Sequence, residues 1–91
     1  MITRRYRVRG IVQGVGFRYF VLYRARALGV CGWVRNLDDG CVEVLAQGGP
    51  DALCALEGLL REGPRHASVA GVTAETVDDG GETFHTFSIE D

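Results

Sequence analysis

The order of alternating strand and helix patterns constrains the fold of this chain more than any other feature. Apolar or small residues occupy every second position over residues 6–12, which is the period of a half-buried strand. Residues 13–16 break this pattern with two glycines. Apolar residues then recur at helical spacing over residues 17–28, and Gly29 is a suitable C-cap. This part of the chain is therefore predicted to run strand, glycine turn, helix.

The same two patterns continue along the rest of the chain. Runs rich in β-formers flank residues 36–40, whose Asp-Gly pair favours a hairpin turn. Pro50 is preset for the first position of a second helix, and Asp51 lies near the positive end of its dipole. After the first helix we expect strands over residues 30–35 and 41–46, a helix over residues 50–62, and strands over residues 69–77 and 84–89.

This order, βαββαβ with an extra C-terminal strand, is typical of the ferredoxin-like α/β sandwich. That fold is of the α+β class, and we expect an antiparallel sheet with two helices on one face. No linker, repeat or low-complexity segment divides the sequence, so residues 1–91 are predicted to form a single domain. Four further residues make the first helix apolar almost all round, so this surface is either covered or forms a contact patch. They are Tyr19, Phe20, Leu22 and Tyr23.

The distribution of charge excludes some chemistries and favours an anion site. All ten basic residues are Arg, so no mechanism can use a lysine amine, which excludes Schiff-base chemistry and a Walker A loop. Residues 1–35 hold eight of these arginines and none of the twelve acidic residues. In a compact sheet the basic and acidic halves interleave and their fields partly cancel, so this asymmetry is supporting evidence only.

Cysteine and histidine usage argues against a metal centre. Cys31, Cys41 and Cys54 are scattered, without a C-x-x-C pair and without a secretory signal before them. We therefore expect reduced cysteines in a cytoplasmic protein, although one pair can close in an oxidising compartment. His66 and His85 are too isolated to build a metal-dependent hydrolase site. We expect no metal and no cofactor.

The turn at residues 13–18 has the composition of an anion site. Gly14 and Gly16 allow successive main-chain N–H groups to converge at the helix N-terminus, where the helix dipole also favours negative charge. Arg18 falls in the first helical turn, where its guanidinium can donate to two oxygens of a phosphate, sulfate or carboxylate. Taken alone, a structural glycine turn with a solvated Arg is the simpler interpretation.

Asn36 adds to the case for this anion site. It is the only Asn in the chain, and it ends the second expected strand, where turn chemistry is its ordinary role. If the first and second strands lie near each other and run in the same direction, Asn36 comes close to the glycine turn. Its amide can then hold a water against the bound anion.

Three blocks of sequence closely resemble the acylphosphatase family. They are RGIVQGVGFR at residues 9–18, GWVRNL at residues 32–37 and GCVE at residues 40–43. The first block is long and specific, and the likeness extends over nearly the whole chain to residues 87–89. The length also matches that of small stand-alone members. In that family the fold is the ferredoxin-like sandwich, and the reaction is hydrolysis of an acyl phosphate to a carboxylate and phosphate, without a metal.

The resemblance also implies roles for individual residues. Arg18 is the phosphate-binding catalytic residue, and Asn36 is the catalytic residue that holds the attacking water. Many members have Thr after the catalytic Asn, whereas this chain has Leu37. The orientation of Asn36 is therefore left to the backbone or to other neighbours. The phosphate-binding residues implied are Gln13, Gly14, Val15, Gly16, Phe17 and Arg18.

Two other functions stay open on the sequence alone. An RNA-binding module shares the fold, but it stacks bases on aromatic side chains of its third strand, and residues 41–45 have none. A non-catalytic accessory domain that binds acyl or carbamoyl phosphate for a larger protein is the other, although a separate chain with Arg18 and Asn36 favours an enzyme. For this enzyme we expect a monomer with a small acyl phosphate substrate, phosphate or sulfate as a product-like ligand, and no nucleic-acid or membrane partner.

Overall fold

A computed structural model describes residues 1–90 of the chain. The order of strands and helices is the predicted one, and the clearest differences in bounds are the early start of the first strand and the late start of the last. The elements are β1 (Ile2–Ile11), α1 (Phe17–Ala27), β2 (Cys31–Asn36), β3 (Val42–Gly48), α2 (Pro50–Glu62), β4 (Ser68–Thr76) and β5 (Phe87–Ile89).

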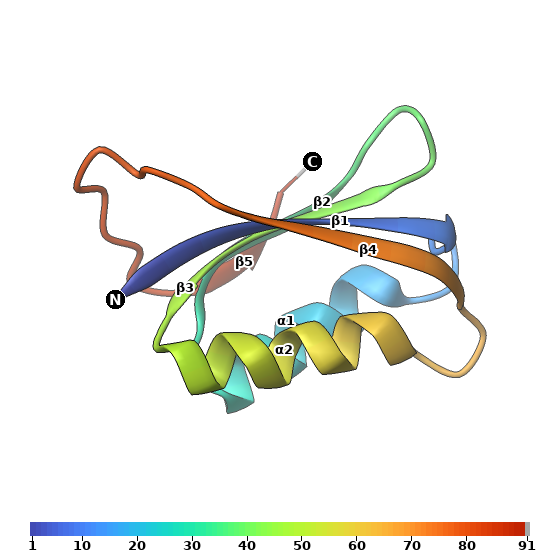
Figure 1. Ribbon diagram of the computed structural model, residues 1–91. Helices are drawn as coiled ribbons and strands as arrows, with labels where there is room; N and C mark the ends of the chain where they lie inside the picture. Colours follow the sequence, from blue (N-terminus) through green and yellow to red (C-terminus); the bar gives the residue numbers. More distant parts are fainter. Residues whose placement is uncertain (91) are drawn as a thin grey trace.

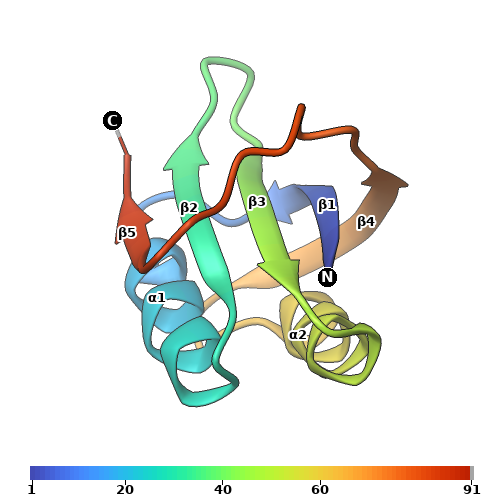
Figure 2. The ribbon, with the colours of Figure 1, turned by 90° about the vertical axis from the view of Figure 1, so that its left-hand side faces the viewer.

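The five strands form one sheet in the order β4-β1-β3-β2-β5, and both helices lie against one of its faces (Figure 1). β1 pairs antiparallel with β3 and β4, and β2 pairs antiparallel with β3. The edge strand β5 pairs parallel with β2. The expectation of an antiparallel sheet is therefore wrong at this edge, and the sheet is mixed. The chain crosses from β4 at one edge to β5 at the other (Figure 2), and such a long connection permits parallel entry, which a hairpin does not.

Gln47 on β3 holds this long connection. Its side chain is buried, and Nε2 donates to Oδ2 of Asp79 at 3.0 Å and to the main-chain oxygen of Glu82 at 2.8 Å. Its Oε1 accepts from the main-chain N–H of Phe84 at 2.9 Å. Because Phe84 bonds to this side chain instead of to β2, the last strand begins at Phe87 and not at Phe84 as predicted.

The core lies between the helices and the inner face of the sheet. Tyr6 shows how a polar atom is accommodated there: its hydroxyl donates to the main-chain oxygen of Leu53 at 3.2 Å, and burial raises its pKa. Each fully buried Val, Leu or Phe stabilises the fold by roughly 1.5–3 kcal/mol relative to an exposed one. The largest fully buried side chains are Tyr6, Phe17, Phe87, Leu53, Leu56, Leu60, Val8, Val12, Val21, Val30, Val34 and Val42.

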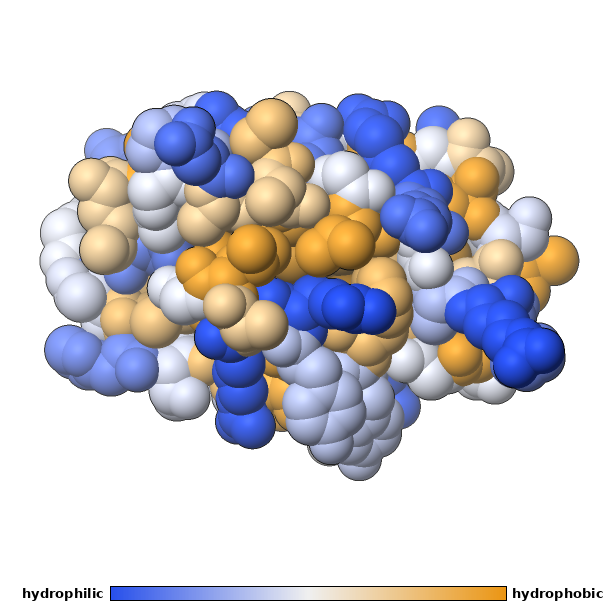
Figure 3. All heavy atoms as spheres, turned by 90° about the horizontal axis from the view of Figure 1, so that it is seen from below, coloured by the Kyte–Doolittle hydropathy of each residue, from blue (hydrophilic) through white to orange (hydrophobic). Residues whose placement is uncertain are grey.

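Two of the four surplus apolar residues predicted on the first helix are at least partly covered, and two are exposed. Leu22 is buried, and the Phe20 ring carries the guanidinium of Arg24 5.2 Å from its centroid. Tyr19 and Tyr23 stay 58% and 63% exposed. The face formed by the two helices has hydrophobic side chains along its middle and hydrophilic ones around them (Figure 3). The two tyrosines are thus the uncovered part of the predicted apolar surface.

Candidate active site

The C-terminal ends of β1 and β2 lie at the same end of the sheet. Both strands are antiparallel to β3, so they run in the same direction. Val42 of β3 pairs with Val8 of β1 on one side and with Asn36 of β2 on the other. The expectation that the strands before the glycine turn and before the hairpin run in the same direction is therefore confirmed. These strands, β1 and β2, are not neighbours, because β3 lies between them. Both the glycine turn and the hairpin after Asn36 therefore lie at this end of the strands.

The turn between β1 and α1 depends on its two glycines. Gly14 has φ of 74° and Gly16 has φ of 79°, both in the left-handed region that other residues adopt at a cost. A Cβ on either would meet nothing within 4 Å, so backbone conformation and not space requires glycine here. Gly16 is the N-cap of α1 and provides no side-chain cap. The first N–H groups of the helix therefore point out of its N-terminus without helical partners.

Phe17 fixes the direction in which the next residue points. Its side chain is fully buried and its ring lies 6.0 Å from that of Phe20, which anchors the first turn of α1 on the core. Arg18 follows directly and is half-buried at the surface. It lines a hollow of about 160 Å³ that also contains Asn36. The described residues around this hollow are Val12, Gly14, Gly16, Phe17, Arg18, Tyr19 and Asn36.

The carboxamide of Asn36 has an unusual environment. Its Oδ1 is buried, and no hydrogen-bond donor among residues 1–90 reaches it. A buried acceptor without a donor costs roughly 1–3 kcal/mol, so such an atom is a candidate for contact with a ligand or a solvent molecule. Asn36 thus offers an acceptor at the hollow that Arg18 lines.

Gln13 is turned toward the hairpin that follows Asn36. Its Nε2 donates to the main-chain oxygen of Leu37 at 2.8 Å and to that of Cys41 at 2.9 Å. Gln13 and Val15 are not among the described residues that line the hollow. The structure places Gly14, Gly16, Phe17 and Arg18 at the hollow. The roles expected for all six residues in phosphate binding stay predictions.

Comparison with known proteins shows the family of the chain. The model of the acylphosphatase family matches residues 4–89. The chain belongs to the acylphosphatase family. It is 46% identical to an acylphosphatase of Bifidobacterium longum over 98% of this chain and 92% of the relative. It is 47% identical to one of Pasteurella multocida over 98% of each. The crystal structure of an acylphosphatase from Bacillus subtilis superposes with a TM-score of 0.95, at 40% identity and over 100% of both chains.

Acylphosphatase activity follows from membership at this identity and coverage. The chain hydrolyses the carboxyl–phosphate bond of acyl phosphates and gives a carboxylate and inorganic phosphate. Among residues 1–90 no three His, Cys, Asp or Glu side chains lie close enough to hold a metal ion. The described helices include none that is both long and apolar enough to cross a membrane.

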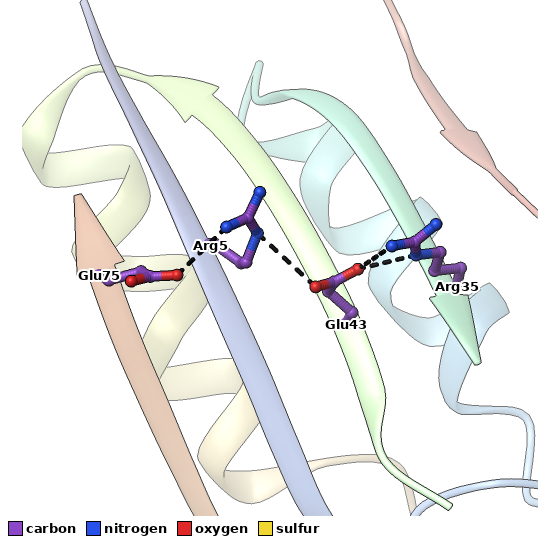
Figure 4. A network of polar contacts seen from close by, with 4 residues as sticks. All are labelled: Arg5, Arg35, Glu43 and Glu75. Carbon is purple, nitrogen blue, oxygen red and sulfur yellow. Dashed lines mark hydrogen bonds and ion pairs between the residues drawn. The ribbon is translucent and has the colours of Figure 1, made fainter. Parts of the chain in front are cut away.

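A larger hollow, of about 330 Å³, lies on the open face of the sheet and is a weaker candidate for the acylphosphatase site. Arg5 in this hollow pairs with Glu43 and Glu75, and Arg35 on the neighbouring strand β2 also pairs with Glu43 (Figure 4). Arg5 lies 3.2 Å from Glu75 and 3.6 Å from Glu43, and Arg35 lies 2.7 Å from Glu43. This pairing also shows how the basic N-terminal part of the sequence and the acidic remainder interleave.

Sequence reasoning missed two residues of the hollow that Arg18 and Asn36 line, Val12 and Tyr19. Val12 fits the alternating strand pattern, and nothing else in the sequence indicates a role at a site. Tyr19 could have been found, because packing does not explain an aromatic residue on the outer side of an amphipathic helix. Among the cysteines, Cys41 is buried, Cys31 is half-buried and Cys54 is exposed.

Proposed function

We propose that acyl phosphates are hydrolysed in the hollow between the glycine turn and Asn36, with Arg18 and Asn36 as catalytic residues. One observation carries this proposal: a guanidinium and a buried acceptor that no donor among residues 1–90 reaches line the same small hollow. A phosphoryl group needs cationic donors around its oxygens and a positioned nucleophile. These residue types supply both requirements.

The phosphoryl end of the substrate binds to the turn and to Arg18. Main-chain N–H groups of residues 14–18 converge on its oxygens, because the left-handed glycines turn successive amides the same way. Arg18 donates two parallel hydrogen bonds from its planar guanidinium, and such charge-assisted bonds are roughly twice as strong as neutral ones. The side chain of Gln13 is committed to the hairpin, so only its main chain is left to contribute.

Asn36 positions the attacking water. Its Oδ1 accepts one hydrogen of the water, which directs an oxygen lone pair toward phosphorus. As the new P–O bond forms, the bond between phosphorus and the acyl oxygen breaks, and its electron pair leaves with the carboxylate. Asn36 is a neutral amide that does not take up a proton, so the proton of the water passes to a phosphoryl oxygen. Catalysis therefore comes from positioning and from stabilised charge on the phosphoryl oxygens.

The test is hydrolysis of benzoyl phosphate with a chelator present, followed for the wild type and for Arg18→Ala and Asn36→Ala. We expect Arg18→Ala to lose both substrate binding and turnover. We expect Asn36→Ala to lower kcat about 10²- to 10³-fold, as loss of one preorganised polar group does elsewhere, with competitive inhibition by inorganic phosphate retained.

The matched control is Arg24→Ala, on the same helix but over the Phe20 ring instead of at the hollow. It should leave kcat and KM close to the wild-type values. A folded wild type without hydrolysis, or the reverse pattern between Arg18→Ala and Asn36→Ala, contradicts the assignment.

The alternatives have less support. A domain that only binds acyl phosphate does not need a buried acceptor such as Asn36 Oδ1, which no donor among the described residues reaches, at its phosphate site. The chain also matches its relatives over nearly their whole length. For an RNA-binding module the open face is unsuitable, because Glu43 lies between Arg5 and Arg35 where bases would stack. Action as a cytoplasmic monomer stays part of the proposal, and sedimentation of the purified protein tests its oligomeric state.

A further inference from the structure

We propose that Gln13 is a positioning residue, which sets the distance between the phosphate-binding turn and Asn36. The inference rests on the proposed function. It starts from the fact that the side-chain amide of Gln13 leaves its own turn and bonds to the hairpin after β2. The chain therefore has a direct link between the two segments that carry the catalytic residues.

The side chain of Gln13 bonds to the two residues at the base of the hairpin. Nε2 of Gln13 donates to the oxygens of Leu37 and Cys41 at 2.8 and 2.9 Å, so both of its protons are used. The Cys41 oxygen also accepts from the N–H of Leu37 at 2.8 Å. One amide thus spans the two residues that close the hairpin, and Leu37 is the residue next to Asn36. A shift of Gln13 would pull on the main chain that carries the Asn36 side chain.

The sheet and the Asn36 side chain give a reason for such a link. β3 separates β1 from β2, so no strand pairing joins the two catalytic segments directly. Oδ1 of Asn36 has no donor among residues 1–90, and the Leu37 side chain has no polar group to orient it. A second link, the ion pair of Arg7 with Asp39, is about half exposed on both sides, and exposed pairs contribute only about 0–1 kcal/mol.

The test variant is Gln13→Met, which keeps side-chain length and removes both donated bonds. A displacement of about 1 Å in a catalytic group can cost about 100-fold in rate, so we expect kcat for benzoyl phosphate to fall about 10- to 100-fold. The inhibition constant of inorganic phosphate should change less than about 3-fold, because the main-chain donors of the turn and Arg18 stay in place. Gln13→Asn, which is one methylene shorter and cannot reach both oxygens, should give an intermediate kcat.

The matched control is Gln47→Met. Gln47 is the other Gln of the chain, and it also bonds to main-chain groups, but in the connection between β4 and β5. Gln47→Met should lower thermal stability and leave kcat unchanged. If it lowers kcat as much as Gln13→Met does, the effect is general loosening of the fold, and the proposal is overturned.

A double-mutant cycle separates action through Asn36 from a direct effect. In the Asn36→Ala background, Gln13→Met should lower kcat less than about 2-fold further, because the group it positions is already gone. The full 10- to 100-fold loss in that background would overturn the proposal.

Nuclear magnetic resonance gives a readout that does not depend on hydrolysis. Asn36 is the only Asn, so its side-chain amide gives one identifiable pair of signals in a ¹⁵N-labelled sample. We expect Gln13→Met to shift or broaden this pair and Gln47→Met to leave it in place. An unchanged Asn36 signal in folded Gln13→Met would overturn the positioning role, even if the wild type proved to lack hydrolase activity and the proposed function failed separately.

Discussion

Arg18 in the first turn of α1 and Asn36 at the end of β2 line one hollow. Arg18 follows β1 by way of the glycine turn, Asn36 ends β2, and β3 lies between these strands. The two side chains thus reach the hollow from separate segments of the chain. Substitutions at the hollow should therefore affect phosphate binding and water positioning separately.

Replacement of Arg18 by Lys tests whether the planar fork matters as well as the charge. Lys keeps the positive charge but cannot donate two parallel hydrogen bonds to one phosphoryl group. Loss of one charged hydrogen bond is worth about 1.5–3 kcal/mol, so KM for benzoyl phosphate and the inhibition constant of phosphate should each rise about 10- to 100-fold. Steady-state kinetics measures both. Equal values for wild type and Arg18→Lys would show that charge alone suffices.

Gly16→Ala tests the left-handed backbone of the turn. An L-residue with φ near the 79° of Gly16 is strained by about 1–2 kcal/mol, although the space beside it is open. We expect a loss of about 1 kcal/mol in free energy of unfolding by urea and weaker phosphate binding by calorimetry. Gly49→Ala is the control, since Gly49 is also an N-cap with open space but has φ of −73°. Equal losses in the two variants would rule out the backbone explanation.

Tyr19→Ala tests a preference for the acyl group. The hollow of about 160 Å³ is smaller than the roughly 300–1,000 Å³ of a typical small-molecule pocket, so the acyl group must extend past its rim. The exposed ring of Tyr19 lies at this rim and offers a stacking surface worth about 0.5–1.5 kcal/mol. We expect kcat/KM to fall about 3- to 10-fold for benzoyl phosphate and to stay unchanged for acetyl phosphate.

The control for this prediction is Tyr23→Ala, one helical turn further along α1. Tyr23 is 63% exposed and is not among the described residues that line the hollow. It should affect neither substrate. The same loss for both acyl phosphates in Tyr19→Ala would point to damage of the phosphate site and contradict a role in acyl selectivity.

Protonation of Asp79 should account for part of the pH dependence of the free energy of unfolding. The hydrogen bond from Thr3 Oγ1 at 2.6 Å, together with a bond from the Gly81 N–H, lowers the pKa of Asp79. A folded pKa below the unfolded value of about 3.9 means that the stabilising contribution is present above that value. It is lost as pH falls through the folded pKa.

Urea unfolding between about pH 5 and pH 2 should therefore show a smaller loss of stability for Asp79→Asn than for the wild type. Asp78→Asn is the control, because Asp78 lies in the same connection and its carboxylate accepts only from the Gly80 N–H among residues 1–90. If both variants follow the wild-type curve, Asp79 does not contribute to acid sensitivity.

The fold was largely predictable because each element carries its own periodic pattern. The helical stripe of Phe17, Val21 and Ala25 is buried as expected. The direction of β5 was not predictable, because an alternating pattern is the same in parallel and antiparallel strands. Its start was also missed, since the bond between Phe84 and Gln47 joins segments far apart in the sequence.

The location of the candidate site was predictable from its sequence motifs, but the orientation of individual side chains was not. The glycine turn, Arg18 and Asn36 could be placed because strand direction decides which loops share an edge of the sheet. The orientation of Gln13 could not, because its acceptors are main-chain oxygens of the hairpin, which no residue type reveals. Tyr19 was noticed as surplus apolar surface, but only the position of the hollow connects it with the site.

The placement of β3 between β1 and β2 also bears on how the protein acquires its activity. The segments that carry Arg18 and Asn36 become aligned only when β1, distant in sequence, has paired with β3 in addition to the local hairpin of β2 and β3. Pairings of this kind form late and slowly, because a long loop of chain must close first. Recovery of hydrolysis during refolding should thus coincide with the cooperative formation of the whole sheet, and a fragment that lacks β3 should have no activity to recover.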